Sequence, residues 1–226
     1  MKQLMSGNEA IARGAYEAGV KVAAAYPGTP STEILESIVE FKDDIYCEWA
    51  PNEKVATEVA IGASIAGVRS LSAMKHVGLN VAADPIFTYS YLGVNGGYVL
   101  TTADDPSMHS SQNEQDNRYY AKFGKIPMIE PSDSQEAKDF MEEAFKVSEE
   151  FDTPVLYRVT TRICHSKSVV ELGKRKEVEP KKYERNAAKF IAAPANAKIA
   201  RIKVEERMKA LEEYACSSPL NKVEYN

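Results

Sequence analysis

The fold of this chain is decided by the stretch YPGTPSTE at residues 26–33, which directly follows the short apolar run at 20–25. Two prolines and a glycine within five positions prevent a strand or a helix from continuing through this stretch. A buried strand is therefore expected to end at residue 25, and Ser31 or Thr32 is placed to cap the helix that follows. A strand, a sharp loop and a helix in this order form the repeating unit of a parallel α/β sheet.

The same unit recurs through the first 160 residues. Capping signals such as Ser6 with Glu9 begin helices, and Pro85 is expected to bend or break the helical segment at 77–91. The pattern predicts an α/β fold with a doubly wound, mostly parallel six-stranded sheet and helices on both faces. The ligand site of such a sheet lies at the carboxyl ends of its strands. The further apolar runs that predict strands lie at 45–49, 70–74, 97–102, 127–130 and 154–160.

The periodicity of the sequence fades after residue 162. We expect residues 1–162 to form the α/β domain and residues 163–226 to form a connector and an amphipathic helix. Residues 174–226 carry 13 Lys and Arg against 8 Asp and Glu, and this basic region is expected to lead toward sequence outside this chain. The helix is expected at 201–215, with one apolar face made of Ile202, Met208, Leu211 and Ala215.

Composition excludes several classes of protein. The chain of 226 residues is 44% hydrophobic, which is enough for a large core and too much for a disordered chain. No run of 18 apolar residues occurs, and polar residues interrupt the beginning of the chain, which predicts no membrane segment and a cytoplasmic location. Glutamates lie among the cations of the basic region, which disfavours nucleic-acid binding.

Motifs for other common sites are missing from the sequence. It has no G-x-S-x-G, no G-x-x-x-x-G-K-S/T and no G-x-G-x-x-G opening a helix, and GVNGG at 93–97 precedes a strand. A nicotinamide-dependent oxidoreductase is therefore disfavoured. The three cysteines are far apart and include no C-x-x-C pair, and the three histidines are too scattered to form a metal site by local spacing.

A second motif lies at the start of the helix that follows the strand at 45–49. The stretch NEKVATEVAIGA at 52–63, together with YPGTPSTE, resembles the pyrimidine-binding domain of thiamine diphosphate enzymes. More narrowly, the two motifs are similar to the amino-terminal domain of the 2-oxoacid:ferredoxin oxidoreductases. GNEAIARG at 7–14 and SSPLN at 217–221 extend this resemblance over the whole chain, toward the alpha subunits that act on indolepyruvate. The resemblance implies oxidative decarboxylation of an aryl pyruvate to an aryl-acetyl-CoA, with ferredoxin as electron acceptor.

The resemblance assigns the central role to Glu53. This residue matches the glutamate that hydrogen-bonds the pyrimidine N1′ of thiamine diphosphate and so activates the cofactor. The small residues of the helix behind it, such as Ala56 and Ala60, provide a partly desolvated setting for a shared proton. The alternative is a solvated glutamate in the first helical turn, which the helix dipole favours.

Three further residues are candidates for binding cofactor or substrate. Thr29 matches the family's threonine beside the substrate carbonyl and the cofactor, the alternative being a plain helix start. Gly28 replaces the bulkier residue of the pyruvate enzymes, which predicts space for a large aryl substrate. His76 follows the third strand, where it is placed to polarise the keto oxygen of the substrate or to contact the cofactor, the alternative being a structural histidine. The family's arginine for the substrate carboxylate has no clear equivalent, since Arg118 is unanchored.

The thiamine diphosphate site that the resemblance implies is incomplete in this sequence. The Gly-Asp-Gly motif that holds Mg²⁺ and the diphosphate is absent, as are the cysteine-rich motifs of 4Fe-4S clusters. The resemblance therefore implies a remaining alpha-subunit region with the diphosphate-binding domain, a second (beta) subunit, and ferredoxin and coenzyme A as partners. An oligomer is expected, and the chain alone is expected to be inactive.

A competing hypothesis assigns the chain no catalysis. In it, the sheet is the scaffold of an interaction module, and the helix at 200–216 docks onto another protein. This hypothesis predicts that Glu53 and Thr29 are dispensable. The two hypotheses differ in where a partner binds, which is across the carboxyl edge of the sheet in the enzyme and along the terminal helix in the interaction module.

Overall fold

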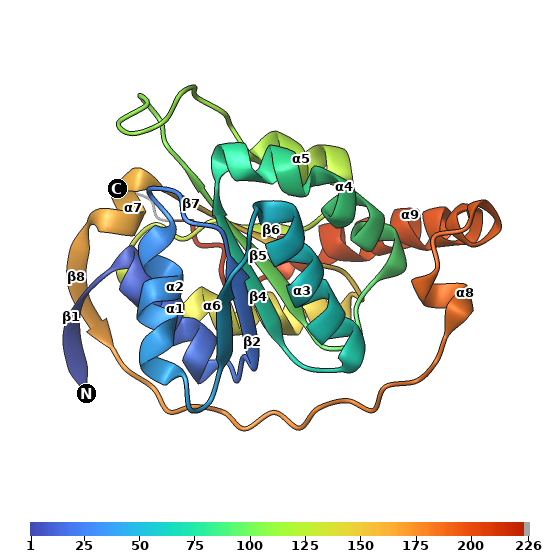
Figure 1. Ribbon diagram of the computed structural model, residues 1–226, viewed down its shortest axis with the longest axis horizontal. Coiled ribbons are helices and arrows are strands. Elements are labelled where there is room, and N and C mark those ends of the chain that lie inside the picture. Colours follow the sequence, from blue (N-terminus) through green and yellow to red (C-terminus); the bar gives the residue numbers. More distant parts are fainter. Residues whose placement is uncertain (224–226) are drawn as a thin grey trace.

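Six parallel strands form the central sheet of the computed structural model, which describes residues 1–223 (Figure 1). Their order is β3-β2-β4-β5-β7-β6, which means that the chain starts inside the sheet and winds outward on both sides. This order confirms the doubly wound α/β fold. The strands are β2 (Val22–Ala25), β3 (Tyr46–Trp49), β4 (Ser70–Lys75), β5 (Tyr98–Asp104), β6 (Met128–Ile129) and β7 (Val155–Thr160).

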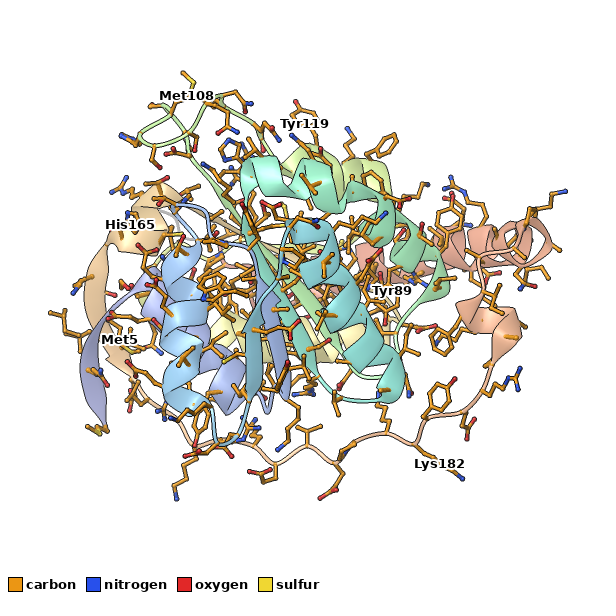
Figure 2. All side chains as sticks on the ribbon, viewed as in Figure 1. Met5, Tyr89, Met108, Tyr119, His165 and Lys182 are labelled. Carbon is orange, nitrogen blue, oxygen red and sulfur yellow. The ribbon has the colours of Figure 1, made fainter. Side chains whose placement is uncertain are left out.

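Helices cover both faces of this sheet. They are α1 (Gly7–Glu17), α2 (Thr32–Ile38), the short 3₁₀ helix η1 (Val39–Phe41), α3 (Glu53–Ala66), α4 (His76–Leu92), α5 (Arg118–Gly124) and α6 (Ser134–Glu150). On one face α1, α2 and α6 bury a core that includes Ile11 and Phe145. On the other face α3 and α4 bury Leu79 and Tyr89, which points from α4 into the interior (Figure 2). Strand side chains alternate between the two cores, as a doubly covered sheet requires.

Local hydrogen bonds explain where the helices begin. The Ser6 hydroxyl accepts from the Glu9 N–H (3.3 Å) while the Glu9 carboxylate accepts from the Ser6 N–H (2.6 Å), which is the predicted capping box of α1. The Asn52 side chain accepts from the Val55 N–H (3.0 Å) at the start of α3, and Asp133 caps α6 in the same way.

Two local expectations differ from the structure. Ser31 occupies the N-cap position of α2, but its hydroxyl donates to the Gly28 carbonyl (2.8 Å) and makes no capping bond. The Thr32 hydroxyl accepts from the Gly28 N–H (2.9 Å), and both hydroxyls therefore close the loop on itself. α4 runs through Pro85 without a break, because this buried proline lies in a long helix whose packing outweighs the one backbone hydrogen bond that proline removes. The expected bend at Pro85 stays a prediction.

A second sheet of two strands lies beside α1 and is not predicted by the sequence pattern. β1 (Lys2–Ser6) pairs antiparallel with β8 (Lys167–Glu171), which α7 (Thr161–His165) connects to β7. Each strand of this pair spans five residues and buries only one of them, Met5 in β1 and Val170 in β8, which gives too short a pattern to detect. The division of the chain at residue 162 stays a prediction, although β8 beyond it pairs with β1 before it.

Residues 172–186 form an extended segment, here called the strap, that runs past the amino-terminal ends of the sheet strands (Figure 1). The backbone N–H groups of Lys176 and Lys181 donate to the carbonyls of Glu17 (2.9 Å) and Gly67 (2.8 Å). Gly67 has a φ of 106°, and a Cβ at this position would collide with the backbone of Lys181. The strap therefore lies at the edge opposite the predicted ligand site.

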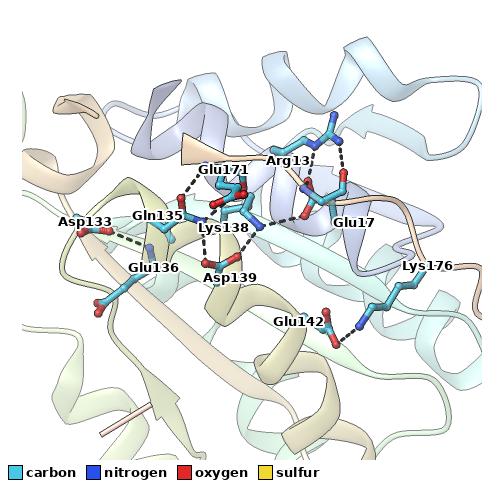
Figure 3. Close-up of polar contacts among 12 residues, drawn as sticks. Arg13, Glu17, Asp133, Gln135, Glu136, Lys138, Asp139, Glu142, Glu171 and Lys176 are labelled. Atoms are coloured by element: carbon cyan, nitrogen blue, oxygen red, sulfur yellow. Dashed lines mark hydrogen bonds and ion pairs between the residues drawn. The ribbon is translucent and has the colours of Figure 1, made fainter. Parts of the chain in front are cut away.

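Ion pairs join α1 and α6 to the beginning of the strap (Figure 3). Lys138 is only 7% exposed and donates to Glu17 at 3.0 Å while it also pairs with Asp139. The other Glu17 oxygen accepts from Arg13 (2.6 Å) and from the Gly173 N–H (2.7 Å). Glu17 therefore holds three parts of the chain together, and its partners compensate for the cost of its partial burial.

The strap leads to α8 (Ala187–Phe190) and to α9 (Pro194–Ser217), which packs against α4. The predicted helix is confirmed, and Leu211 and Met208 of its predicted apolar face pack against the core. The prediction is wrong at Ile202, which is 62% exposed, and at Ala215, which is also exposed. Val204 and Arg207 are buried beside Leu211, and Arg207 donates to the Ser90 carbonyl (2.7 Å) near the end of α4. Among residues 1–223, none of the helices combines the length and the hydropathy that a membrane span requires.

Candidate functional site

A hollow of about 570 Å³ opens at the carboxyl ends of β2, β3 and β4. Loops that follow four strands contribute to it, which is the arrangement expected at the ligand edge of a doubly wound sheet. Its lining is made of Tyr26, Pro27, Gly28, Glu53, Lys75, Val77, Asn80, Val81, Gln112 and Asn113. Two of the four sequence-predicted site residues, Glu53 and Gly28, therefore lie together, whereas Thr29 and His76 are not part of the lining.

Glu53 is the first residue of α3 and is only 8% exposed. Its carboxylate lies against the first turn of α4, where a Cβ on Gly78 would approach Glu53 Oε1 to 2.5 Å and Cγ to 2.7 Å. Within residues 1–223 no protein group donates a hydrogen bond to this carboxylate, although it lines the hollow. A nearly buried carboxylate that faces a cavity without a donor is suited to accept a hydrogen bond from a ligand or to share a proton with it.

Gly28 lies between the ends of β2 and β4. A Cβ at this position would approach Lys75 Cδ to 2.9 Å and Lys75 Cγ to 3.0 Å. The room that Gly28 leaves is therefore taken by the methylene groups of Lys75, and space for an aryl substrate at this point stays a prediction. Lys75 itself is half-buried and ends β4.

Thr29 is exposed at the rim of the loop, next to the buried Pro30. The Asn8 amide holds this loop in place from α1, because it donates to the Pro30 carbonyl (2.7 Å) and to Glu33 (3.0 Å). Asn8 belongs to the GNE stretch at the start of the chain, and it is 1% exposed. The role of Thr29 beside the cofactor stays a prediction.

His76 is fully buried as the first residue of α4. Its Nε2 lies 3.0 Å from the Asn113 carbonyl, and its own carbonyl accepts from the Asn117 amide (3.3 Å). Its Nδ1 is buried and has no hydrogen-bond partner in the part of the chain that the structure describes. This geometry favours the structural alternative, in which His76 anchors the loop 105–117, while a contact with substrate or cofactor stays a prediction.

The loop 105–117 supplies Gln112 and Asn113 to the hollow, and Asp105 fixes its shape. Burial alone would raise the pKa of the Asp105 carboxyl, but hydrogen bonds lower it well below its usual range. The donors include the Ser110 N–H (2.9 Å) and the Thr161 hydroxyl (2.7 Å). An ionised Asp105 therefore ties this loop to the beginning of α7.

Arg158 forms a buried charge cluster that sequence reasoning did not identify. It is 4% exposed on β7 and donates to Asp104 at 2.8 Å and to Glu130. Burial raises the pKa of Asp104, which the Asn117 N–H and Arg158 oppose. Arg118, the candidate at the sequence level, is exposed and paired with Asp116 at 2.8 Å. Neither Arg158 nor Arg118 lines the hollow. In the sequence, the signal for a buried partner of Arg158 is its position within the apolar strand at 154–160.

Comparison with known proteins finds one family model and several relatives that match this chain. The family model described as pyruvate flavodoxin/ferredoxin oxidoreductase, thiamine diphosphate-binding, matches residues 13–215. The indolepyruvate oxidoreductase subunit IorA of Archaeoglobus fulgidus is 51% identical over 99% of this chain and 37% of its own length. The subunit IorA of Methanothermobacter marburgensis is 50% identical over 96% of this chain and 36% of its own length. The chain thus spans a little over a third of these relatives.

More distant proteins share the fold. The 2-oxoglutarate synthase subunit KorA of Archaeoglobus fulgidus is 26% identical over 84% of this chain and 56% of its own length. A solved structure of 2-oxoglutarate:ferredoxin oxidoreductase from Magnetococcus marinus superimposes with a TM-score of 0.74 at 16% identity, covering 94% of this chain and 45% of that chain. This likeness establishes the α/β fold independently of the sequence motifs.

Proposed function

Because the chain belongs to the pyruvate flavodoxin/ferredoxin oxidoreductase family, through its thiamine diphosphate-binding domain, we propose that it supplies the pyrimidine side of the active site of a 2-oxoacid:ferredoxin oxidoreductase. The identity to subunits named for indolepyruvate supports an aryl pyruvate, with indolepyruvate first, as the substrate. The reaction is oxidative decarboxylation to an aryl-acetyl-CoA, with ferredoxin accepting the electrons, and its proposed location is the cytoplasm.

The Glu53 carboxylate is the observation that carries this proposal. It is nearly buried, lines the hollow and accepts no hydrogen bond from residues 1–223. Such a group fits the pyrimidine ring, which offers a ring nitrogen that can share a proton with a carboxylic acid. When bound, thiamine diphosphate supplies the carbon nucleophile and the electron sink for cleavage of a 2-oxoacid. The Glu53 carboxyl oxygen shares a proton with that ring nitrogen, and Gly78 keeps this oxygen at the wall of the hollow.

The remaining groups of the site belong, in this proposal, to other parts of the enzyme. Among residues 1–223 no cluster of three His, Cys, Asp or Glu side chains is placed to hold a metal ion. We assign Mg²⁺ and the diphosphate to a diphosphate-binding region of the alpha subunit, and 4Fe-4S clusters to further sequence. A beta subunit, ferredoxin and coenzyme A complete the assembly, which is an oligomer. Within this chain, Thr29 is proposed to lie beside the cofactor and the substrate. His76 is proposed to contact both of them, and Gly28 the substrate.

Replacement of Glu53 tests this function. The chain is assembled with its diphosphate-binding region, thiamine diphosphate and Mg²⁺, and hydrogen–deuterium exchange at C2 of the cofactor is followed by NMR. We expect Glu53→Gln to slow this exchange by about 10²- to 10⁴-fold, the usual contribution of a positioned proton donor. Glu58→Gln, on the exposed side of the same helix, should leave the rate unchanged. An undiminished rate in Glu53→Gln contradicts the proposed role.

The interaction-module hypothesis is tested by the same assembly. The terminal helix that it requires already buries Val204, Arg207 and Leu211 within this chain. We therefore expect alanine substitutions on the exposed side of α9 to leave assembly intact, while loss of Glu53 removes activity. Native mass spectrometry measures the assembly. The interaction-module hypothesis would be favoured if the α9 variants failed to assemble and if the complex remained active after replacement of Glu53.

A further inference from the structure

The hollow carries one cation and one anion among its lining residues, Lys75 and Glu53. A 2-oxoacid is an anion at neutral pH, and the carboxylate of Glu53 repels it if no positive charge compensates. A buried or half-buried anion in proteins is normally paired with a cation or with several hydrogen-bond donors. Whether the hollow can bind an anionic substrate therefore depends on the charge of Lys75.

Lys75 differs from the other lysines that lose part of their solvent contact. Every other buried or half-buried lysine forms an ion pair with a carboxylate, namely Lys21, Lys54, Lys125, Lys138 and Lys189. Lys75 forms neither an ion pair nor a side-chain hydrogen bond with any of residues 1–223. Its charge is thus available at the hollow.

The position of Lys75 is defined by packing. Its Cγ and Cδ lie 3.0 Å and 2.9 Å from the point where a Cβ on residue 28 would stand, and only glycine leaves room for them. Its backbone is held as the last residue of β4, opposite Ala103 of β5, and as the N-cap of α4. No side chain caps α4 at this end, and the positive end of the 17-residue helix adds to the potential of the ammonium group.

We infer that Lys75 binds the carboxylate of the 2-oxoacid substrate, which rests on the proposed function of the hollow. Among residues 1–223 no arginine lines the hollow. Arg158 pairs with Asp104 and Arg118 pairs with Asp116, and the exposed Arg162, which follows β7, is not part of the lining either. Lys75 thus holds the acid end of the substrate near β4, on the wall that also carries Gly28, while Glu53 faces the pyrimidine. Gly28 acts as a positioning residue, because its missing side chain admits Lys75.

The test compares an acid with its uncharged ester. Binding of phenylpyruvate and of methyl phenylpyruvate to the chain is measured by NMR titration. We expect the chain to bind the acid at least about tenfold more tightly than the ester, as a charge-assisted hydrogen bond would give. Lys75→Met should abolish this preference, and Lys54→Met, whose lysine pairs with Asp84 outside the lining, should retain it. Gly28→Val should lower the preference although Lys75 is present.

Three results would overturn the inference. The first is equal binding of acid and ester, or no saturable binding of the acid, by the unmodified chain. The second is an unchanged preference in Lys75→Met. The third comes from inorganic pyrophosphate as a probe: if Lys75→Met weakens pyrophosphate binding but not phenylpyruvate binding, the cation serves a phosphate group. These results leave the role of Glu53 untouched, because cofactor proton exchange is measured without substrate.

Discussion

Gly78 determines where the Glu53 carboxylate lies. The two residues come from different helices, and the carboxylate occupies the volume that any larger residue at position 78 would need. A side chain there pushes the acid away from the wall of the hollow, even though the charge and the chemistry of Glu53 are retained. Because misplacement by about 1 Å costs on the order of 10²-fold in enzyme rates, this contact matters for activation of the cofactor.

Gly78→Ala is therefore expected to slow C2 exchange of the cofactor in the assembled enzyme by at least about tenfold. Its control is Gly62→Ala in α3, where a Cβ meets nothing within 4 Å. In both variants the change from glycine to alanine favours the helix by about 1 kcal/mol. A slower exchange in Gly78→Ala alone therefore reports a displaced carboxylate and not a weakened fold. Exchange rates are measured together with thermal unfolding, and equal exchange rates in the two variants contradict the role of Gly78.

For single residues, the sequence predicts the position along a helix or strand end but not the tertiary contacts of the side chain. Glu53 was predictable, because a motif ties it to the start of a helix after a strand. The function of Gly28 was predicted as open space, yet the structure fills that space with Lys75, which is distant in sequence. His76 follows a strand end like a ligand residue, but the loop at 105–117 covers it, and no local pattern reports such a tertiary contact.

Among the elements, one ion pair joins the start of β4 to the end of α6. Arg69 donates from Nε to Glu149 Oε1 (2.9 Å) and from Nη2 to Oε2 (2.8 Å), and it also reaches the Ala18 carbonyl (2.8 Å). Burial alone would raise the pKa of the Glu149 carboxyl, but the paired guanidinium lowers it overall. Bidentate pairs of this kind are among the stronger polar contacts in proteins.

Stability should depend on pH through this pair. Since the folded-state pKa of Glu149 is depressed, its contribution is complete above about pH 4.3, the ordinary value for glutamate, and is lost as the pH falls through the lower folded-state value. We expect Glu149→Gln to cost about 1–3 kcal/mol of unfolding free energy at neutral pH and progressively less in acid. Urea unfolding at several pH values measures this, with exposed Glu212→Gln as control. A cost that does not fall in acid would exclude the pair as its source.

Elements whose signals are local were predictable, and those whose signals are tertiary were not. Ser6 caps α1 through a bond that spans three residues, as predicted, and Asn52 and Asp133 cap α3 and α6 through bonds that are equally local. β1 and β8 each have only five residues, and each gains its strand structure from a partner at the other end of the chain. Pro85 predicts a bend or a break in α4, and packing prevents the break.

On the scale of the whole molecule, α9 is fastened to α4 by a buried arginine. Burial lowers the pKa of Arg207, and its Nη1 donates to the Ser90 carbonyl at 2.7 Å. Val204 and Leu211 are buried on the same side of α9. α9 is thus part of the folded domain, and it contacts α4 at Ser90, near the end of that helix opposite to Gly78.

Arg207→Met should loosen α9 without disturbing the sheet. We expect the free energy of unfolding to fall by about 1–3 kcal/mol, because the Ser90 carbonyl is left without its donor. Hydrogen–deuterium exchange should rise over 194–217 and stay unchanged over the strands, whereas exposed Lys203→Met should alter neither. Faster exchange throughout the sheet would show that α9 is a cooperative part of the core.

The strap shows how far sequence reasoning extends for the whole molecule. Faded periodicity at 172–186 predicts a connector, but the course of that connector depends on backbone bonds to Glu17 and Gly67 that composition does not encode. The basic charge of the region is explained in part by pairs such as Lys176 with Glu142, which serve the fold and not an external partner.

The pairing of Lys2 with Glu171 has a consequence for biosynthesis. β1 leaves the ribosome before β8, its partner in the two-stranded sheet, which emerges after the six-stranded sheet has been synthesised. Contacts between such distant positions form late, because closing a long loop costs entropy before any contact is gained. Until then the first strand presents an unpaired edge, which makes the nascent chain a natural client for chaperones that shield exposed strands.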